Sequence, residues 1–320
     1  MALTSRLAPT PSGLLHLGNA WSFVLTWLAV KSVGGSLRLR IDDLDATRAQ
    51  DEYLEDVFAS LAWLGIECDA GPRDVAAFKR HDSQRLRLDA YGNAVEVLKA
   101  GGHLYACTCS RAQIRAFGEG TVYPGTCRER GLPLNTRDAA LRFRMPDGPV
   151  VMQGWGGGPL MLDPARTMGD FVVVRRDGEP AYQLASVVDD VTHGVNLIVR
   201  GNDLLPSTAA QLALAQALGG EIARAFTAIT FWHHPLVLDD LGDKLSKSRG
   251  ADSLAALRAR FETPTVVLQW FARALGFRDE AAARVRSLQD LLPGFDRARL
   301  PTTSLRLSDF GRFAEANAGP

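Results

Sequence analysis

The first hundred residues carry a regular succession of hydrophobic patterns. Residues 5–9 favour a short strand, residues 10–18 form a loop with Gly and Pro, and the apolar residues 19–33 favour a helix that stops at a pair of glycines. Residues 36–41 then alternate between hydrophobic and polar positions, which is typical of a second strand. This order of elements predicts a parallel sheet, with ligands bound where the loop meets the helix.

Helical spacing continues after this unit and is then lost. Hydrophobic residues recur at helical spacing from Leu54 to Leu64, and residues 85–101 predict another helix that ends in glycines. Over residues 103–165 the pattern breaks down into cysteines, prolines and the tract GWGGG, interrupted by a strand-like segment at residues 140–145. We interpret this stretch as an insertion into the sheet domain.

Regular patterns return after the insertion. Residues 170–176 and 196–201 favour strands, residues 207–220 favour a helix, and a polar loop at residues 242–250 precedes Arg- and Ala-rich helices. The prediction is an α/β protein with a Rossmann-like parallel sheet, an insertion and a small C-terminal helical segment. Its expected parts are residues 1–102 and 166–250 as the two halves of the catalytic sheet domain, 103–165 as the insertion, and 251–320 as the helical domain.

Composition limits the class of protein but does not identify it. The chain has 320 residues, 46% of them hydrophobic, which suits a globular protein of about two domains. Lys plus Arg equals Asp plus Glu at 36 each, so net charge neither favours nor excludes a nucleic-acid partner. The apolar stretches are far shorter than the ~18 residues of a membrane span, and the N-terminus lacks a signal region. We therefore expect a cytoplasmic protein with no membrane partner.

The first chemical motif is PSGLLHLGN, which lies between the first strand and the first helix. A single histidine is more often structural than functional. In this position, however, the amides of a helix N-terminus favour phosphate, Gly18 permits close approach of a nucleotide, and His16 can donate to a phosphate oxygen. The second motif is KLSKS, Lys244 to Ser248, whose simplest interpretation is an exposed charged turn between glycines.

Taken together, the two motifs resemble the signatures of the class I aminoacyl-tRNA synthetases, an H-x-G-x loop near the N-terminus and a K-x-S-K-S loop far downstream. The resemblance implies that ATP and Mg²⁺ are bound between the loops and that an amino acid is activated as its adenylate. It assigns ATP binding to His16, Gly18, Asn19, Lys244, Ser246 and Lys247, of which His16, Lys244 and Lys247 would be catalytic.

Further segments resemble the glutamyl-tRNA synthetases: RLAPTPSG, LRLRIDDLD, AYQLASVVDD and GVNLIVRGNDLL. The resemblance covers most of residues 5–250 and implies L-glutamate as the substrate, because a buried carboxylate calls for a guanidinium. The implied glutamate pocket consists of Arg6, Leu7, Ala8, Pro9, Thr10, Asp42, Tyr182 and Arg200. Asp42 stands where the family usually has glutamate, which puts the contact with the α-ammonium group in question. The neighbouring acids Asp189 and Asp190 are interpreted as a solvated or structural pair.

Three of the four cysteines, Cys107, Cys109 and Cys127, lie close together in the sequence, as does Tyr123. Three thiolates suit one structural Zn²⁺, with Tyr123 or His103 as the fourth ligand and three free thiols as the alternative. The arrangement of Cys107, Cys109, Tyr123 and Cys127 resembles the zinc site of the glutamyl-queuosine tRNA(Asp) synthetases, which are short paralogues of glutamyl-tRNA synthetase. Cys68 stands alone and is interpreted as a small buried side chain.

The length of the C-terminal part favours the same subfamily. About 70 residues follow Ser248, too few for a large anticodon-reading region. The resemblance implies that glutamate is transferred to queuosine in the anticodon loop of tRNA(Asp), by an enzyme that we expect to be a monomer. The alternatives are a truncated glutamyl-tRNA synthetase that charges a tRNA 3′ end, a non-catalytic paralogue, and a ligase that joins an amino acid to a small molecule.

Overall fold

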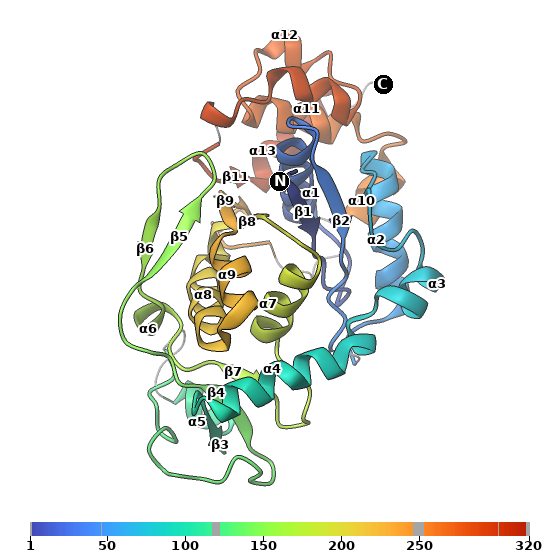
Figure 1. The fold of residues 1–320 in the computed structure, drawn as a ribbon. Coiled ribbons are helices and arrows are strands. Elements are labelled where there is room, and N and C mark those ends of the chain that lie inside the picture. The colour runs from blue at the N-terminus through green and yellow to red at the C-terminus, as the bar shows by residue number, and fades with distance from the viewer. Residues whose placement is uncertain (1, 46, 117–121, 246–252, 300, 318–320) are drawn as a thin grey trace. The chain divides into compact units, whose positions relative to one another are not determined.

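The structure is a computed structural model that describes residues 2–45, 47–116, 122–245, 253–299 and 301–317 (Figure 1). The chain divides into two compact units. The first unit consists of Met1–Ser83, Leu197–Asp203 and Trp232–Pro320, and the second of Gln84–Asn196 and Leu204–Phe231. No helix in the described ranges combines the length and the apolar character needed to cross a membrane.

The first unit is built on short parallel strands and one buried helix. Strand β1 (Thr4–Leu7) pairs in parallel with β2 (Ser36–Leu39), and α1 (Leu17–Lys31) connects them. Strand β8 (Leu197–Gly201) contacts both β1 and α1. The chain enters β2 at Gly35, where a Cβ atom would lie 2.6 Å from the carbonyl oxygen of Leu3, so the close approach to β1 requires glycine.

The remaining elements of the first unit are short, and several cover α1. They are α2 (Asp51–Leu64), α3 (Val75–Ala77), η1 (Phe78–Asp82), the end of β9 (Thr230–His234), β10 (Val237–Leu238), α10 (Leu254–Arg260), α11 (Thr265–Ala274), α12 (Asp279–Ala282), η5 (Leu288–Gly294), η6 (Arg297–Arg299), β11 (Leu305–Arg306) and α13 (Leu307–Asn317). The rings of Trp21 in α1 and Phe271 in α11 lie 4.9 Å apart, so the expected C-terminal helices exist and pack on the first helix of the chain.

The second unit contains a helical group and two small antiparallel sheets. Strands β3 (Leu104–Cys107), β4 (Ala140–Phe143) and β7 (Val172–Val174) form one sheet, and β5 (Val150–Gly154) pairs with β6 (Leu160–Leu162) in the other. The start of β9 extends the second sheet in parallel, with Gln153 opposite Thr230. The helices are η2 (Gln84–Arg87), α4 (Leu88–Ala100), α5 (Arg111–Arg115), α6 (Pro164–Thr167), α7 (Tyr182–Thr192), α8 (Leu205–Leu218) and α9 (Gly220–Thr227). The short helix η3 (Asn202–Leu204) spans the boundary, and only its last residue belongs to the second unit.

Asp189 holds the helical group of the second unit together. Its fully buried carboxylate accepts hydrogen bonds from Gln84 Nε2 at 2.8 Å, from the Arg87 guanidinium at 3.0 Å, and from Tyr91 Oη at 2.8 Å. Burial, followed by the charge of Asp189, raises the pKa of Tyr91. The structural interpretation of Asp189 is therefore correct, whereas the idea of a solvated pair is wrong, because Asp190 is also buried.

The predicted elements of the first unit are present, but the single parallel sheet is only part of the architecture. The structure has mixed sheets, since the strands of the predicted insertion pair in antiparallel fashion. Helix α7 was not predicted as an element. The four-part division of the chain into domains stays a prediction.

Candidate active site and metal centre

His16 occupies the N-cap of α1 and forms a reciprocal capping box with Asn19. The His16 ring nitrogen Nδ1 accepts from the backbone N–H of Gly18 at 3.1 Å, and Asn19 Oδ1 accepts from the backbone N–H of His16 at 3.0 Å. Because Nδ1 acts as an acceptor, the ring proton of neutral His16 lies on Nε2, which is then a donor. The motif thus fixes both the tautomer and the direction of the imidazole at the positive end of a helix.

Gly18 leaves close space for the His16 ring. A Cβ atom at residue 18 would lie 3.0 Å from Cε1 and 3.1 Å from Nδ1 of His16, so a side chain there would require the ring to shift by a few tenths of an ångström. The imidazole is largely buried, at 9% exposure, which restricts it to the capping position. The sequence predicted close approach of a nucleotide at Gly18, whereas the structure shows close approach of the His16 ring.

Lys244, the first lysine of the KLSKS motif, forms an ion pair with Asp203. It follows a tight turn after β10, in which Asp239 Oδ1 accepts from the backbone N–H of Asp243 at 2.9 Å. Ser246 and Lys247 lie outside the described residues. Asp203 was not singled out from the sequence, although it belongs to the GNDLL segment that carries part of the resemblance.

The segment that follows the KLSKS motif in the sequence, beginning at Ser253, lies next to His16. Ser253 forms an isolated antiparallel bridge with His16, and the backbone N–H of Leu254 donates to the carbonyl oxygen of Leu15 at 2.7 Å. The PSGLLHLGN motif and the segment that begins five residues after the KLSKS motif are therefore joined by a backbone hydrogen bond next to the capped helix. An ATP site formed by the two loops stays a prediction.

Strand β9 ends in two histidines, His233 and His234, and His234 lies near Asp203 and Lys244. His234 is buried and its Nδ1 lies 2.9 Å from the carbonyl oxygen of Pro235. Burial lowers the pKa of His234 to about 4, and burial together with the charge of Arg200 lowers the pKa of His233 to about 3. Both imidazoles are therefore neutral at physiological pH, so the positive charge in this part of the unit comes from Arg and Lys side chains.

Three residues predicted to recognise glutamate belong to the first unit. Arg6 on β1 and Arg200 on β8 are each 5% exposed, and these two strands contact one another. Asp42 follows β2 and is 6% exposed, and its backbone N–H donates to Pro9 O at 2.9 Å. Tyr182 belongs to the second unit and is 40% exposed.

The other predicted pocket residues, Leu7, Ala8, Pro9 and Thr10, run from the end of β1 into the following loop. The complete glutamate pocket stays a prediction.

Arg40 is a partner of Asp42 that sequence reasoning missed. Its Nε donates to Asp42 Oδ1 at 2.7 Å and its Nη2 donates to Asp42 Oδ2 at 3.2 Å, and both side chains are almost fully buried. A buried carboxylate needs such a bidentate partner to offset its loss of hydration. The alternation that predicted the strand places residues 40 and 42 on the same face, which was the available signal.

The cysteine cluster of the second unit brings together the four residues expected to bind a metal. Within the part of the chain that the structure describes, Cys107, Cys109 and Cys127 place their sulfur atoms within 4.8 Å of one another. Tyr123 Oη lies 3.3 Å from Cys107 Sγ and 3.5 Å from Cys109 Sγ, and Cys109 Sγ lies 3.5 Å from Cys127 Sγ. The rival ligand His103 is not in this group, and its ring packs instead against Phe143.

The distances in the cluster can be compared with those expected for tetrahedral coordination of a metal ion. A Zn²⁺ ion with bonds of about 2.3 Å to sulfur and about 2.0 Å to oxygen separates its ligand atoms by roughly 3.5–3.8 Å. Three of the separations, from Tyr123 Oη to Cys107 Sγ and Cys109 Sγ and from Cys109 Sγ to Cys127 Sγ, are 3.3–3.5 Å and close to those edges. Three thiols and one phenol oxygen thus fit Zn²⁺ in number and chemistry, and all three sulfur atoms lie within 4.8 Å of one another.

The electrostatics of the cluster favour a thiolate at Cys127. Burial opposes ionisation, but hydrogen bonds from the Tyr123 hydroxyl, the backbone of Thr108, Cys109 and Arg130 outweigh it and lower the pKa of Cys127 to about 6. Burial and the neighbouring thiols raise the pKa of Tyr123, and the Arg142 guanidinium lies 3.8 Å above its ring. By contrast, burial raises the pKa of the isolated Cys68 to about 12, although this side chain is only partly buried and not fully buried as predicted.

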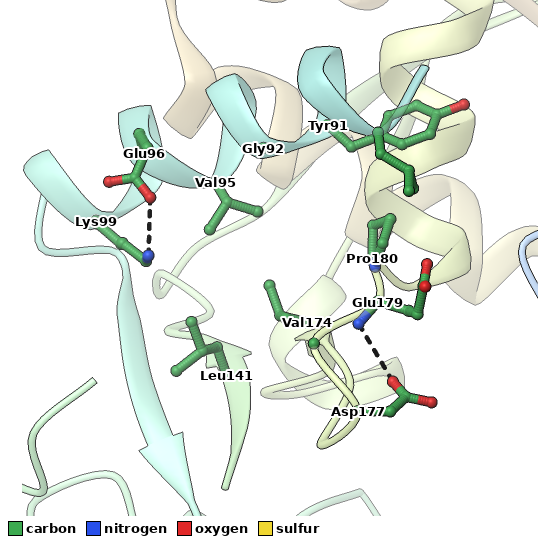
Figure 2. Close-up of a pocket in the computed structure, with 12 residues that line it drawn as sticks. Tyr91, Gly92, Val95, Glu96, Lys99, Leu141, Val174, Asp177, Glu179 and Pro180 are labelled. Carbon is green, nitrogen blue, oxygen red and sulfur yellow. Dashed lines mark hydrogen bonds and ion pairs between the residues drawn. The ribbon is translucent and has the colours of Figure 1, made fainter. Parts of the chain in front are cut away.

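A pocket of about 370 Å³ lies in the second unit between α4, β4, β7 and the turn before α7 (Figure 2). Val95, Leu141 and Val174 form its apolar part, and Lys99 Nζ donates to Glu96 Oε1 at 2.8 Å on one side (Figure 2). None of the residues predicted from the sequence lines this pocket.

Comparison with known proteins identifies the family. Residues 2–302 match the family model described as tRNA synthetases class I (E and Q), catalytic domain. The chain belongs to this family and is a ligase of the class I aminoacyl-tRNA-synthetase type. The crystal structure of glutamate-tRNA synthetase from Elizabethkingia anophelis has the same fold, with a TM-score of 0.76 at 24% identity over 99% of this chain and 70% of that one.

Two groups of relatives resemble the chain in sequence. A protein named Glutamyl-Q tRNA(Asp) synthetase from Symbiobacterium thermophilum is 40% identical over 95% of this chain and 96% of its own length. One of the same name from Deinococcus radiodurans is 38% identical over 92% of this chain and 96% of its own length. A glutamate–tRNA ligase from Desulfosudis oleivorans is 38% identical over 80% of this chain and 53% of its own length. The resemblance to the short paralogues is therefore confirmed.

Proposed function

We propose that this enzyme activates L-glutamate with ATP and transfers it to queuosine at the wobble position of tRNA(Asp). The observation that carries the first half is the backbone contact between His16 of the capped helix and Ser253, directly after the KLSKS loop. The second half is supported by the relatives named Glutamyl-Q tRNA(Asp) synthetase, which match along 95% or more of their own length.

In the activation step, the α-carboxylate of glutamate attacks the α-phosphorus of magnesium-bound ATP and pyrophosphate leaves. His16 donates from Nε2 to a phosphate oxygen, at the positive end of α1 and with Asn19 fixing the cap. Lys244 exchanges Asp203 for a phosphate group, and Lys247 neutralises charge on the leaving pyrophosphate. Gly18 and Ser246 complete the binding of ATP.

Recognition of glutamate uses the buried charges of the first unit. Arg6 and Arg200 supply guanidinium groups for carboxylates, and Asp42, held by Arg40, faces the α-ammonium group. The resemblance also assigns Tyr182 to glutamate binding. The residues from Leu7 to Thr10 supply backbone groups beside the substrate.

In the transfer step, a hydroxyl of the queuosine cyclopentenediol attacks the carbonyl carbon of glutamyl adenylate. The hydroxyl proton passes to the leaving phosphate group, the bond from carbon to the phosphate oxygen breaks with its electron pair staying on that oxygen, and AMP leaves. The product is an ester on the modified base, which mild base hydrolyses. The base is presented by the anticodon loop, where an unstacked nucleotide can be reached.

We also propose that Cys107, Cys109, Tyr123 and Cys127 hold one structural Zn²⁺ ion. The ion would replace the mutual hydrogen bonds of the cluster by bonds to the metal, and would tie the end of β3 to the segment around Cys127. The site has no open position for a substrate if all four groups bind. A cytoplasmic location and a monomeric state stay predictions.

The decisive experiment compares two tRNAs. Purified enzyme is incubated with labelled glutamate, ATP and matched tRNA(Asp) with or without queuosine, and the label released by mild base is measured. We expect label on the queuosine-containing tRNA alone. Equal labelling of both tRNAs would instead favour charging of the 3′ end, the activity in the name of the Desulfosudis oleivorans relative. Label on neither, together with no glutamate-dependent exchange of pyrophosphate into ATP, would refute the proposed function.

A further inference from the structure

Leu15, the residue before His16, has both of its peptide groups held by distant parts of the first unit. Its N–H donates to Asp56 Oδ2 at 2.9 Å, and its carbonyl oxygen accepts from the backbone N–H of Leu254 at 2.7 Å. The Leu15 side chain is 1% exposed. The backbone that leads into the His16 cap is therefore fixed by α2 on one side and by the start of α10 on the other.

Asp56 is a buried carboxylate that needs a positive partner. It is 5% exposed, and its second oxygen, Oδ1, accepts from Arg258 Nη2 at 2.9 Å. Arg258 also donates from Nη1 to Ser60 Oγ at 2.5 Å. Ser60 Oγ also donates to Asp56 Oδ1 at 3.5 Å, but one hydroxyl and one backbone N–H do not replace the hydration that a buried carboxylate loses, so the position of Asp56 depends on Arg258.

Arg258 lies on α10, which starts directly after the KLSKS loop. Ser253 caps this helix by accepting from the backbone N–H of Ala256 at 3.1 Å, and the same residue forms the bridge to His16. One Arg side chain and one backbone hydrogen bond thus join α10 to the residue before His16, through Asp56 and through Leu254. The two connections hold the two peptide groups of the same residue, Leu15.

We propose that Asp56 and Arg258 are positioning residues that hold the His16 loop against the segment after the KLSKS loop, and so set the geometry of the ATP site. This inference rests on the proposed function for its catalytic consequence. Neither residue needs to touch ATP. Since a misplacement of about 1 Å can cost roughly 100-fold in rate, loss of the Arg258 contact should be visible in turnover with ATP.

The test uses Arg258→Gln with Arg260→Gln as the matched control. Arg260 lies two residues further along the same helix and is exposed. We expect Arg258→Gln to change kcat/KM for ATP in glutamate-dependent pyrophosphate exchange by about tenfold or more, with KM for glutamate within about twofold of wild type. Arg260→Gln should match wild type in both. Arg258→Lys keeps the positive charge but loses the planar guanidinium that binds Asp56 and Ser60 with two nitrogen atoms, so it should recover part of the lost activity.

A second measurement separates positioning from folding and from the proposed function. Amide exchange of the peptide that contains Leu15 should be faster in Arg258→Gln than in Arg260→Gln, with peptides of the second unit unchanged. The double variant Asp56→Asn with Arg258→Gln should be no worse than the more severe single variant, because both act through one contact.

The positioning role is overturned if Arg258→Gln equals Arg260→Gln in ATP kinetics and in exchange at Leu15, or loses only thermal stability. If wild-type protein shows no pyrophosphate exchange, the proposed function fails, while the amide-exchange result still decides whether Arg258 holds the loop.

Discussion

The capped-helix site of the first unit and the cysteine cluster of the second unit are built in opposite ways. Around His16, the residues come from segments as far apart as Asp56 and Leu254, and they are joined by hydrogen bonds to the backbone of Leu15. The cysteine cluster takes all its ligand atoms from residues 107–127. The first arrangement depends on the whole unit, whereas the second depends on one short segment and, in our proposal, on one ion.

This difference has an energetic reason. Closing a short loop costs little conformational entropy, so a few strong bonds to one ion can fix a local site. A site made of distant segments is held in place by the packed core. Here that core includes the buried residues of α1 and the contact of Trp21 with Phe271. Substitutions around His16 should therefore affect chemistry, while substitutions in the cluster should affect metal content and the stability of the second unit.

The largest effect is expected from His16→Asn. Asn is a good N-cap, so the substitution keeps an acceptor for the backbone N–H of Gly18 and should change stability by less than about 1 kcal/mol. It removes the imidazole donor, which should lower the rate of pyrophosphate exchange by about 10²–10³-fold. His81→Asn, at an exposed residue of η1, is the control. More than a tenth of wild-type activity in His16→Asn would show that the imidazole serves only as a cap.

Cys107→Ser tests the local site. With one sulfur ligand removed, zinc affinity should fall by roughly 100-fold, at least as much as when an outer-sphere partner is lost. Metal analysis of purified protein and competition with a chelator measure this. Cys68→Ser is the matched control because Cys68 lies outside the cluster. If pyrophosphate exchange falls further in Cys107→Ser than in His16→Asn, the contrast between the two sites is wrong.

The pH dependence of the metal-free protein sharpens the same contrast. Because the pKa of Cys127 is lowered to about 6 when folded, the thiolate favours folding above the ordinary thiol pKa of about 8.5, and this contribution is lost as pH falls through 6. In denaturant unfolding after chelation, the stability difference between wild type and Cys127→Ser should shrink from pH 9 to pH 5. An equal difference at both ends would contradict the lowered pKa.

The smallest effect is expected from Asp42→Glu. The resemblance to the glutamyl-tRNA synthetases implies glutamate at this position, and the added methylene would move the carboxylate by about one bond length in the proposed pocket. Arg40 remains available as its partner. We expect glutamate use to survive or improve, with KM for glutamate within a few-fold of wild type. A large rise in that KM would mean that Asp42 and Arg40 are matched to one another in length.

Much of the fold was predictable where a local pattern sufficed. The first strand and helix, the second strand and the helices around Leu54 to Leu64 and residues 88–100 are present close to the predicted bounds. The helix α1 begins at Leu17, two residues earlier than predicted, because the His16 ring caps it. The antiparallel pairing of β3, β4 and β7 was not predictable, since short, wholly buried strands give no alternation that fixes a partner or a direction.

By itself, the sequence determined the two loop motifs and the clustering of three cysteines with Tyr123. These features depend on residues that are close together in the sequence, so their spacing is enough to predict them. Only the tertiary structure decided that Asp203 pairs with Lys244, that Arg258 supports Asp56, and that Leu254 binds Leu15. The physical reason is that a buried charge or peptide group takes whichever partner the packed core brings within hydrogen-bond distance, and that choice is made across the whole unit.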